Sequence, residues 1–422
     1  MSKTENWLKL INPDYLNRGF FNIKPGLSRI KIILSSMNIK RDRPIFQIVG
    51  TNGKGSTACI ISRLLGNLGY SVGTFMSPHE ISPAERILIN NRQIKADQLN
   101  EIISVVSRAE VSTEIVLSYF ELLTAAALYW FKINNVDLIV LEAGMGGRWD
   151  ASSALGQTVL VVTSIGIDHT DYLGKTAVKI AEEKIAAVSE NSKLVIAPQR
   201  PDVYRKLTAY AEKRTLPIVK CIDKKLIKIL EDNLSGTSFL YKNMLIKTNL
   251  LGEYQPINIV TAIESVRLLY DLPDDIVRKT AGFMKIPSRL EAQKVNNLTI
   301  IFDGGHNQDA IEGVCRFFKK IKKRITVIYS SMKDKDYQSN LCLLSTLSDS
   351  LLIVELPFER AEKAINLIDA AKGIFKYSRI VDIAGLSEFV KLKYDSDEII
   401  LITGSFYLTG LCKYVIKMID DT

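Results

Sequence analysis

The sequence contains few of the residues that build disulfide frameworks and metal clusters. Its 422 residues include five cysteines, three histidines and three tryptophans. The cysteines are scattered without a Cys-x-x-Cys pair, so we expect neither disulfides nor a zinc site, and reduced thiols are typical of the cytoplasm. No uninterrupted apolar run reaches about 18 residues, and the N-terminus lacks the apolar core of a secretory signal. We therefore predict a cytoplasmic protein with no membrane partner.

Charge and composition are those of an ordinary globular protein. Hydrophobic residues make up 47% and charged residues 24% of the chain, and its length favours two domains. The formal net charge is +9, but the one tight basic run, residues 319–324 (KKIKKR), is predicted to end a helix. Lysines at a helix C-terminus suit the helix dipole and face solvent. We therefore expect no nucleic-acid partner.

Short apolar runs alternate with amphipathic patterns along most of the chain. We predict strands at residues 45–49, 138–141, 159–163 and 194–197, and helices at 55–68, 114–133, 175–188 and 253–270. Buried strands that alternate with helices favour a parallel sheet covered on both faces. The sequence therefore predicts an α/β fold.

The alternation restarts after a polar stretch at residues 287–297, which we interpret as a hinge. Beyond it we predict strands at 298–302, 325–329, 351–354 and 398–402, and helices at 310–320, 361–371 and 408–418. Together with the phosphate-binding loop described next, this pattern predicts a P-loop-type parallel-sheet ATPase domain at residues 1–290. A smaller, Rossmann-like α/β domain follows at residues 291–422.

A phosphate-binding loop is predicted at residues 50–57 (GTNGKGST), between a strand and a helix. Glycines let several backbone N–H groups point at one anion, and the following helix adds its positive end. Lys54 can reach the outer phosphates, and Ser56 or Thr57 can offer a hydroxyl to Mg²⁺. The loop departs from the standard Walker pattern, because Ile48 replaces its first glycine and Gly55 separates Lys54 from Ser56.

Two further loops follow predicted parallel strands, whose carboxyl ends meet at one edge of a sheet. The first, residues 142–150 (EAGMGGRWD), begins with Glu142, which is placed to hold a hard cation such as Mg²⁺. The second, residues 166–174 (GIDHTDYLG), contains His169, a candidate metal ligand. From the residues alone, Lys184 beside two glutamates is an ordinary ion-pair partner.

These pieces together resemble the folylpolyglutamate synthase/dihydrofolate synthase branch of the Mur ligase family. Besides the loops above, the ordered series that carries the resemblance comprises residues 24–30 (KPGLSRI), 77–79 (SPH), 85–87 (ERI), 118–121 (SYFE), 183–184 (EK), 251–255 (LGEYQ), 287–291 (PSRLE), 303–307 (DGGHN), 333–336 (KDKD) and 403–405 (TGS). The chain departs from the family's usual pattern at Glu80, at Ser152 and Ser153, and at residues 185–187.

The resemblance implies a role for each matching position. It implies a nucleotide site of Asn52, Gly53, Lys54, Gly55, Ser56, Thr57, Asn258, Arg289 and Asp303. It implies a metal site of Ser56, Ser77, Glu142 and His169. It implies a catalytic set of Lys54, Lys184, His169, Asp303 and His306, with Lys184 carboxylated by CO₂. It implies a substrate site of Phe120, Glu121, Asp150 and Ser405.

The function implied is that of an ATP- and Mg²⁺-dependent amide ligase. It would add L-glutamate to dihydropteroate, to the γ-carboxyl of a folate, or to both, through an acyl phosphate and with release of ADP. We expect a monomer that acts on these small molecules. The alternatives are a Mur-family ligase with another carboxylate acceptor, such as a peptidoglycan precursor, and a P-loop NTPase without ligase activity.

Overall fold

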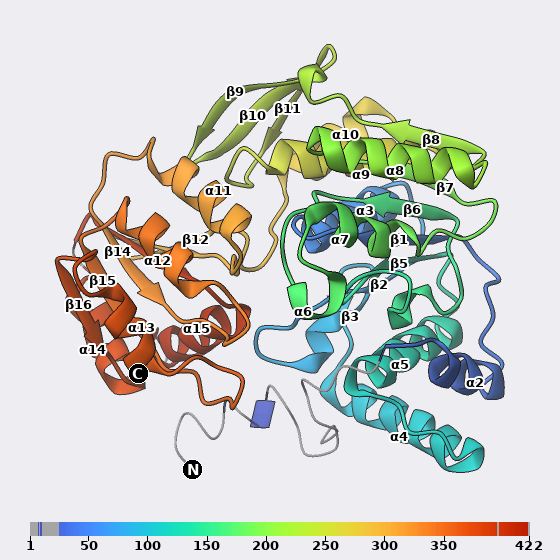
Figure 1. Ribbon diagram of the computed structural model, residues 1–422, viewed down its shortest axis with the longest axis horizontal. Coiled ribbons are helices and arrows are strands. Elements are labelled where there is room, and N and C mark those ends of the chain that lie inside the picture. The colour runs from blue at the N-terminus through green and yellow to red at the C-terminus, as the bar shows by residue number, and fades with distance from the viewer. Residues whose placement is uncertain (1–6, 8, 11–24, 395, 421–422) are drawn as a thin grey trace.

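The computed structural model describes residues 7, 9–10, 25–394 and 396–420, with side chains up to Lys417. Two large sheets, each with helices on both faces, form two parts of the molecule (Figure 1), and a small third sheet packs beside the first part. Among the described residues, none of the helices combines the length and apolarity needed to cross a membrane.

The first sheet has eight strands in the order β4-β3-β2-β5-β1-β6-β7-β8. Six strands are parallel: β1 (Ile45–Val49), β2 (Val72–Phe75), β5 (Leu138–Glu142), β6 (Val159–Val162), β7 (Lys193–Ile196) and β8 (Ile218–Cys221). Two short antiparallel strands complete one edge: β3 (Ile87–Ile89) and β4 (Arg92–Gln93). The central strands are buried on both faces, which is why they read as continuous apolar runs.

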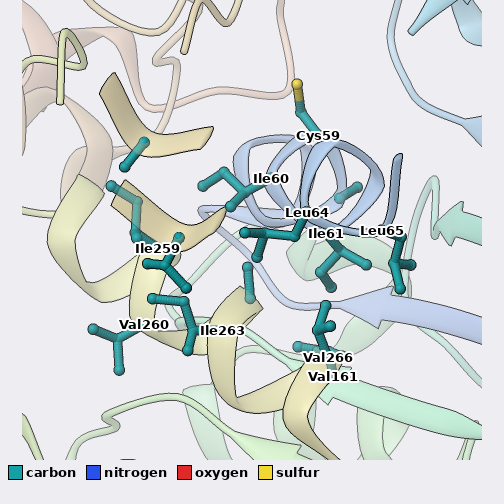
Figure 2. Close-up of a cluster of buried hydrophobic side chains, with 14 of the residues drawn as sticks. Cys59, Ile60, Ile61, Leu64, Leu65, Val161, Ile259, Val260, Ile263 and Val266 are labelled. Carbon is teal, nitrogen blue, oxygen red and sulfur yellow. The ribbon is translucent and has the colours of Figure 1, made fainter. Parts of the chain in front are cut away.

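Alternate side chains of these strands pack on opposite faces of the sheet. Phe46 and Ile48 contribute to the core beneath α3 (Lys54–Asn67), α9 (Gln255–Arg267) and α10 (Asp274–Gly282). Figure 2 shows side chains of α3 and α9 meeting above Val161 of β6. The other face carries α2 (Ser28–Ser36), α4 (Ala96–Thr113), α5 (Tyr119–Ile133), α7 (Ala177–Ile185) and α8 (Pro201–Lys213). The loops before α3 and after β5 and β6 are therefore fixed by a core on each side.

The third sheet is antiparallel and has three strands, β9 (Ile227–Asn233), β10 (Gly236–Tyr241) and β11 (Met244–Thr248). Phe239 and Ile246 join the core shared by α3 and α9. This sheet was not predicted, because Glu231 and Asp232 fall within its exposed strand β9 and weaken the strand signal.

The C-terminal sheet has six strands in the order β12-β13-β17-β14-β15-β16. Its members are β12 (Glu291–Val295), β13 (Leu298–Phe302), β14 (Ile325–Tyr329), β15 (Ser350–Ile353), β16 (Tyr377–Ile380) and β17 (Ile399–Thr403), all parallel except β12. One face packs on α11 (Gln308–Phe318), α12 (Tyr337–Ser345) and α13 (Ala364–Ala371). The other face packs on α14 (Ile383–Leu392) and α15 (Phe406–Asp420).

Both α/β parts are as predicted, and most differences lie at element ends. The predicted helix at 114–133 begins only at Tyr119 as α5, because Glu114 ends the preceding helix α4 in a left-handed conformation and Ser118 caps α5. The predicted hinge at 287–297 is wrong for residues 291–295, which pair with β13 as the edge strand β12. Short helices within residues 25–394 are η2 (Pro83–Arg86), η3 (Ala151–Ser153), η4 (Lys224–Leu226) and α6 (Thr170–Leu173).

Candidate active site

A cavity of about 370 Å³ lies between the first sheet and the C-terminal sheet. Loops at the carboxyl ends of β1, β2, β5 and β6 line one side, and residues 289–406 of the C-terminal part line the other. The predicted site residues that line it are Asn52, Lys54, Ser77, Phe120, Glu121, Glu142, Asp150, His169, Arg289, His306 and Ser405. The fold therefore brings together residues that are distant in the sequence.

The loop after β1 has the backbone geometry of a phosphate-binding turn. Gly53 has φ 85°, in the left-handed region that glycine tolerates best, and α3 begins at the next residue. A β-carbon on Gly53 would lie 2.4 Å from Oδ1 of Asn258 on α9. The Lys54 ammonium donates to the carbonyl oxygens of Gly50 and Thr51, each at 3.1 Å. Burial lowers the pKa of Lys54, although Glu142 opposes that shift.

The additional glycine of the loop, Gly55, lies in a closely packed place. A β-carbon there would lie 3.3 and 3.4 Å from the two carboxylate oxygens of Glu142 and 3.5 Å from Nη2 of Arg289. Glu142 ends β5 and is 1% exposed, and its Oε2 accepts the N–H of Ser77 at 2.9 Å. Burial raises the pKa of Glu142, and Lys54 partly offsets that effect. Gly55 thus lets the loop, a buried carboxylate and a guanidinium meet.

The side chains of the four predicted metal ligands are chemically suited to a magnesium ion. Glu142 offers carboxylate oxygens, Ser56 and Ser77 offer hydroxyls, and His169 offers an imidazole. Burial lowers the pKa of His169 to about 3, so its ring is neutral and has a free lone pair at pH 7. The described residues contain no cluster of three or more His, Cys, Asp or Glu side chains suited to a metal. A cation here would therefore depend on hydroxyl and phosphate oxygens as well, as Mg²⁺ commonly does.

Lys184 lies on α7 and is 3% exposed. Its ammonium donates to the carbonyl of Gly50 at 2.7 Å, so Lys184 contacts the first glycine of the phosphate loop. Burial, reinforced by the charge of Lys54, lowers the pKa of Lys184 from 10.5 to about 7. About half of the side chains would therefore be neutral amines at pH 7. The surrounding fold thus gives Lys184 a reactivity that its sequence neighbours did not indicate.

Asp168 is the main polar link between the two sides of the cavity. Its carboxylate lies 2.5 Å from the ammonium of Lys335, 3.3 Å from Nε2 of His306 and 3.3 Å from Nδ2 of Asn307. All three partners belong to the C-terminal part. Although burial opposes it, the hydrogen bond and charge of His306, with help from Lys335, hold the pKa of Asp168 far below its usual value.

Sequence reasoning assigned no role to Asp168 or Lys335, although both lie in segments that it singled out. Asp168 directly precedes the candidate ligand His169, and Lys335 is the second lysine of residues 333–336 (KDKD). The available signal was the presence of opposite charges in two candidate site loops. Pairing them requires knowing that the two sheets face each other.

Arg289 stands between two residues with left-handed backbone, Ser288 and Leu290, each at φ 48°. Its guanidinium carbon lies 4.5 Å from the ring centroid of Phe406, the first residue of α15. Asp303 does not reach across the cavity. Its two oxygens accept the backbone N–H groups of Leu290 and Gly305, so it shapes the turn that carries Arg289.

Two of the four predicted substrate residues are occupied by structural contacts. Glu121 caps α5 through the N–H and hydroxyl of Ser118 and accepts from Nε of Arg29 at 3.1 and 3.2 Å. Asp150 accepts the N–H groups of Met145 and Ser152. Both side chains line the cavity, but these contacts account for two buried carboxylates without a ligand.

Phe120 and Ser405 are placed differently. The Phe120 ring covers Gly144, where a β-carbon would lie 2.7 Å from Cζ, and it forms an apolar wall of the cavity. Ser405 accepts the N–H of Tyr407 at the start of α15. Among the described residues, the buried hydroxyl of Thr57 has no hydrogen-bond partner, which suits a ligand at the head of α3. The predicted lead-in at residues 24–30 includes Lys24, which lies outside the described residues.

Comparison with known proteins identifies the family. Residues 48–266 match the Mur ligase middle domain, and residues 288–406 match the Mur ligase glutamate ligase domain. The chain belongs to the Mur ligase family. The expectation of an ADP-forming amide ligase is thereby confirmed.

Relatives place this Mur ligase in the branch that its sequence resembles. The dihydrofolate synthase/folylpolyglutamate synthase of Bacillus subtilis is 32% identical over 407 residues, covering 92% of this chain and 94% of that protein. The protein of the same name from Mycobacterium tuberculosis is 31% identical over 374 residues, covering 80% and 76%. The structure of M. tuberculosis folylpolyglutamate synthase with ADP and AMPPCP superposes with a TM-score of 0.83 at 28% identity, covering 92% of this chain and 95% of that one.

Proposed function

We propose that this Mur ligase adds L-glutamate to dihydropteroate, to the γ-carboxyl of tetrahydrofolates, or to both, with conversion of ATP to ADP and phosphate. The observation that most directly supports the proposal is that Lys54, Glu142 and Arg289 lie around Gly55 and line the interdomain cavity. The near full-length similarity to proteins named dihydrofolate synthase/folylpolyglutamate synthase supports the choice of acceptor.

In the first step, the acceptor carboxylate attacks the γ-phosphate of ATP and forms an acyl phosphate and ADP. The N–H groups of the loop, with Lys54, would hold the phosphates, while Asn258 and Arg289 would contact the nucleotide beside Gly53 and Gly55. Fixed positive groups need no reorganisation as charge moves onto the leaving oxygen, so positioning and electrostatics account for the rate.

A bound Mg²⁺ would neutralise phosphate charge during this transfer. We propose Ser56, Ser77, Glu142 and His169 as the residues that hold it. The His169 ring is neutral, as a metal ligand must be, and the buried Glu142 carboxylate is held by the backbone N–H of Ser77; a bound cation would offset the burial that raises the pKa of Glu142.

Carboxylation of Lys184 is part of the proposal. Carbamate formation requires a neutral amine, which attacks CO₂ and releases a proton. The pKa of about 7 supplies that amine at physiological pH, and the carbamate would replace a buried cation by an anion near Lys54. An anion at this point would add a ligand for a second cation or hold Lys54 in place.

In the second step, the amino group of glutamate attacks the acyl phosphate and releases inorganic phosphate. His306 and Lys335, held by Asp168, stand on the C-terminal side of the cavity, where they would orient the incoming amino acid and support proton transfer from it. Ser405 and Phe120 would contact the substrates, with Glu121 and Asp150 shaping their loops. Water would hydrolyse the acyl phosphate, so closure of residues 291–422 over residues 1–290 protects it.

A phosphate-release assay tests this proposal. The enzyme is given ATP, Mg²⁺ and L-glutamate with dihydropteroate, tetrahydrofolate or a muramyl-peptide precursor in parallel, and the products are identified by mass. We expect glutamate-dependent phosphate release with at least one pterin. Release with the muramyl acceptor alone would reject the folate assignment but keep the ligase, and ATP hydrolysis independent of every acceptor would reject both.

A further inference from the structure

Lys413 lies on α15 and joins three segments that are distant in the sequence. Its ammonium is 2.6 Å from Oε2 of Glu80 and 2.5 Å from Oε2 of Glu291. Glu80 belongs to the loop after β2, and Glu291 begins β12. The ammonium also lies 5.2 Å from the centroid of the buried Phe302 ring. One cation thus holds two carboxylates from opposite sides of the interdomain boundary.

Each carboxylate is close in sequence to a residue of the proposed metal or nucleotide site. Glu80 is three residues from Ser77 and is buried, with only 7% of its surface exposed. Glu291 is two residues from Arg289, and the same Oε2 that meets Lys413 accepts the N–H of Ser288 at 2.9 Å. Lys413 is therefore linked to both the Ser77 loop and the Arg289 turn.

Backbone packing makes the link stiff. A β-carbon on Gly410, one turn before Lys413, would lie 2.1 Å from the carbonyl oxygen of Glu80, so α15 touches the main chain of this loop. The first residue of the helix, Phe406, lies beneath Arg289. Helix α15 thus contacts the Arg289 turn at its start and the Glu80 loop one turn later, and Figure 1 shows it on the side of the C-terminal sheet that faces the first sheet.

The charges are unequal in number, and Glu80 and Lys413 are largely buried, whereas the Glu291 side chain is 36% exposed. Burial raises the pKa of Glu80, and Lys413 opposes that rise. Burial would lower the pKa of Lys413, but Glu80 and Glu291 outweigh it and raise the pKa. A buried ion pair contributes little to stability compared with apolar side chains of similar volume, whereas loss of one partner leaves an uncompensated charge. This arrangement is costly if its only role is stability.

We propose that Lys413 is a positioning residue that sets the spacing between the Ser77 loop and Arg289, and so aligns the metal ligand with the nucleotide phosphates. The inference rests on the proposed function, which assigns Ser77 and Arg289 to metal and nucleotide. It predicts that Lys413 acts on the Mg²⁺-dependent part of nucleotide binding and on turnover, with little effect on glutamate binding.

The test compares Lys413→Met with Lys413→Arg, with the double variant Glu80→Leu/Lys413→Met, and with Lys417→Met as a control on the exposed end of the same helix. ADP affinity is measured by calorimetry with Mg²⁺ and with EDTA. Urea unfolding, kcat and the KM for glutamate are measured on the same preparations. The double variant replaces the ion pair by apolar groups and separates stability from positioning.

For Lys413→Met we expect a roughly tenfold to hundredfold loss of kcat and about tenfold weaker ADP binding with Mg²⁺. ADP affinity in EDTA and the KM for glutamate stay within about twofold of the wild-type values, because neither depends on the distance between Ser77 and Arg289. Lys413→Arg recovers most of the loss. Glu80→Leu/Lys413→Met regains resistance to urea without regaining kcat.

Two outcomes overturn the inference. One is recovery of kcat together with stability in the double variant, which makes the role of Lys413 structural. The other is equal Mg²⁺-dependent ADP binding in Lys413→Met and Lys417→Met. A wild-type enzyme without activity toward either pterin would reject the proposed function instead, and the ADP titrations would still decide the role of Lys413.

Discussion

Lys184 gives the strongest quantitative prediction, because its environment fixes both the sign and the size of an effect on stability. The folded protein holds the pKa of Lys184 at about 7, against 10.5 in an unfolded chain. Between these values the unfolded chain binds more protons than the folded one, so the free energy of unfolding rises with pH. The perturbation is Lys184→Met, which removes the titrating group and keeps most of its length.

The two pKa values set the magnitude. Protonation of the unfolded chain costs the native state roughly 4 kcal/mol at pH 7.5 and roughly 1 kcal/mol at pH 9.5. The wild-type protein should therefore gain roughly 2–3 kcal/mol between these pH values relative to Lys184→Met. Other groups titrate in both proteins, and most of their contributions cancel in the difference.

Urea unfolding at a series of pH values, in buffers purged of CO₂, measures this difference. Equal pH dependence in the two proteins would refute the reasoning, since a buried lysine with an ordinary pKa has no such slope. Adding bicarbonate then tests the carbamate. It should stabilise the wild-type protein alone, because a modification that occurs only in the folded state adds stability by mass action.

Three further predictions concern the same cavity. Gly55→Ala should weaken ADP binding by roughly tenfold with the fold intact, because its β-carbon would crowd both Glu142 oxygens; an ADP titration measures this. Glu142→Gln keeps an acceptor for Ser77 but loses the charge, so half-saturation by Mg²⁺ should move up by roughly tenfold or more in a turnover assay. Asp168→Asn leaves Lys335 with only the more distant carboxylate of Asp334, at 3.5 Å, and should cost about 1.5–3 kcal/mol in urea unfolding, whereas the exposed Asp171→Asn should cost less than about 0.5 kcal/mol.

The fold was predictable where a short-range pattern determines it. Strands such as β1 and β13 are fully buried, and their apolar runs matched the structure because no polar face interrupts them. The edge strand β12 was taken as part of a hinge, because Gln293 and Lys294 lie exposed on it and carry no apolar signal. An edge strand of this kind is identified by the strand with which it pairs, and only two residues separate β12 from its partner β13.

The site was predictable in its loops but not in its contacts. Glycine spacing indicated the phosphate loop, yet only the structure shows that Glu142 and Arg289 approach Gly55 closely. Glu121 was assigned to substrate from its position in a motif, and its carboxylate proves to be occupied by Ser118 and Arg29. The Ser118 contact is a local capping box that the sequence could have indicated, whereas Arg29 lies 92 residues from Glu121, a separation that local patterns do not record.

The contacts that close the cavity are polar, and this has a consequence for the mechanism. Asn52 exchanges amide hydrogen bonds with Asn307, and Asp168 holds His306 and Lys335. Polar contacts between domains re-form in water at small cost, unlike an apolar interface, so they suit parts that separate to admit substrates. Asn52 and Asp168 each adjoin a residue proposed to bind phosphate or metal. Docking of the C-terminal part would therefore fix the same loops that hold the nucleotide, so that phosphoryl transfer waits until the cavity is shielded from water.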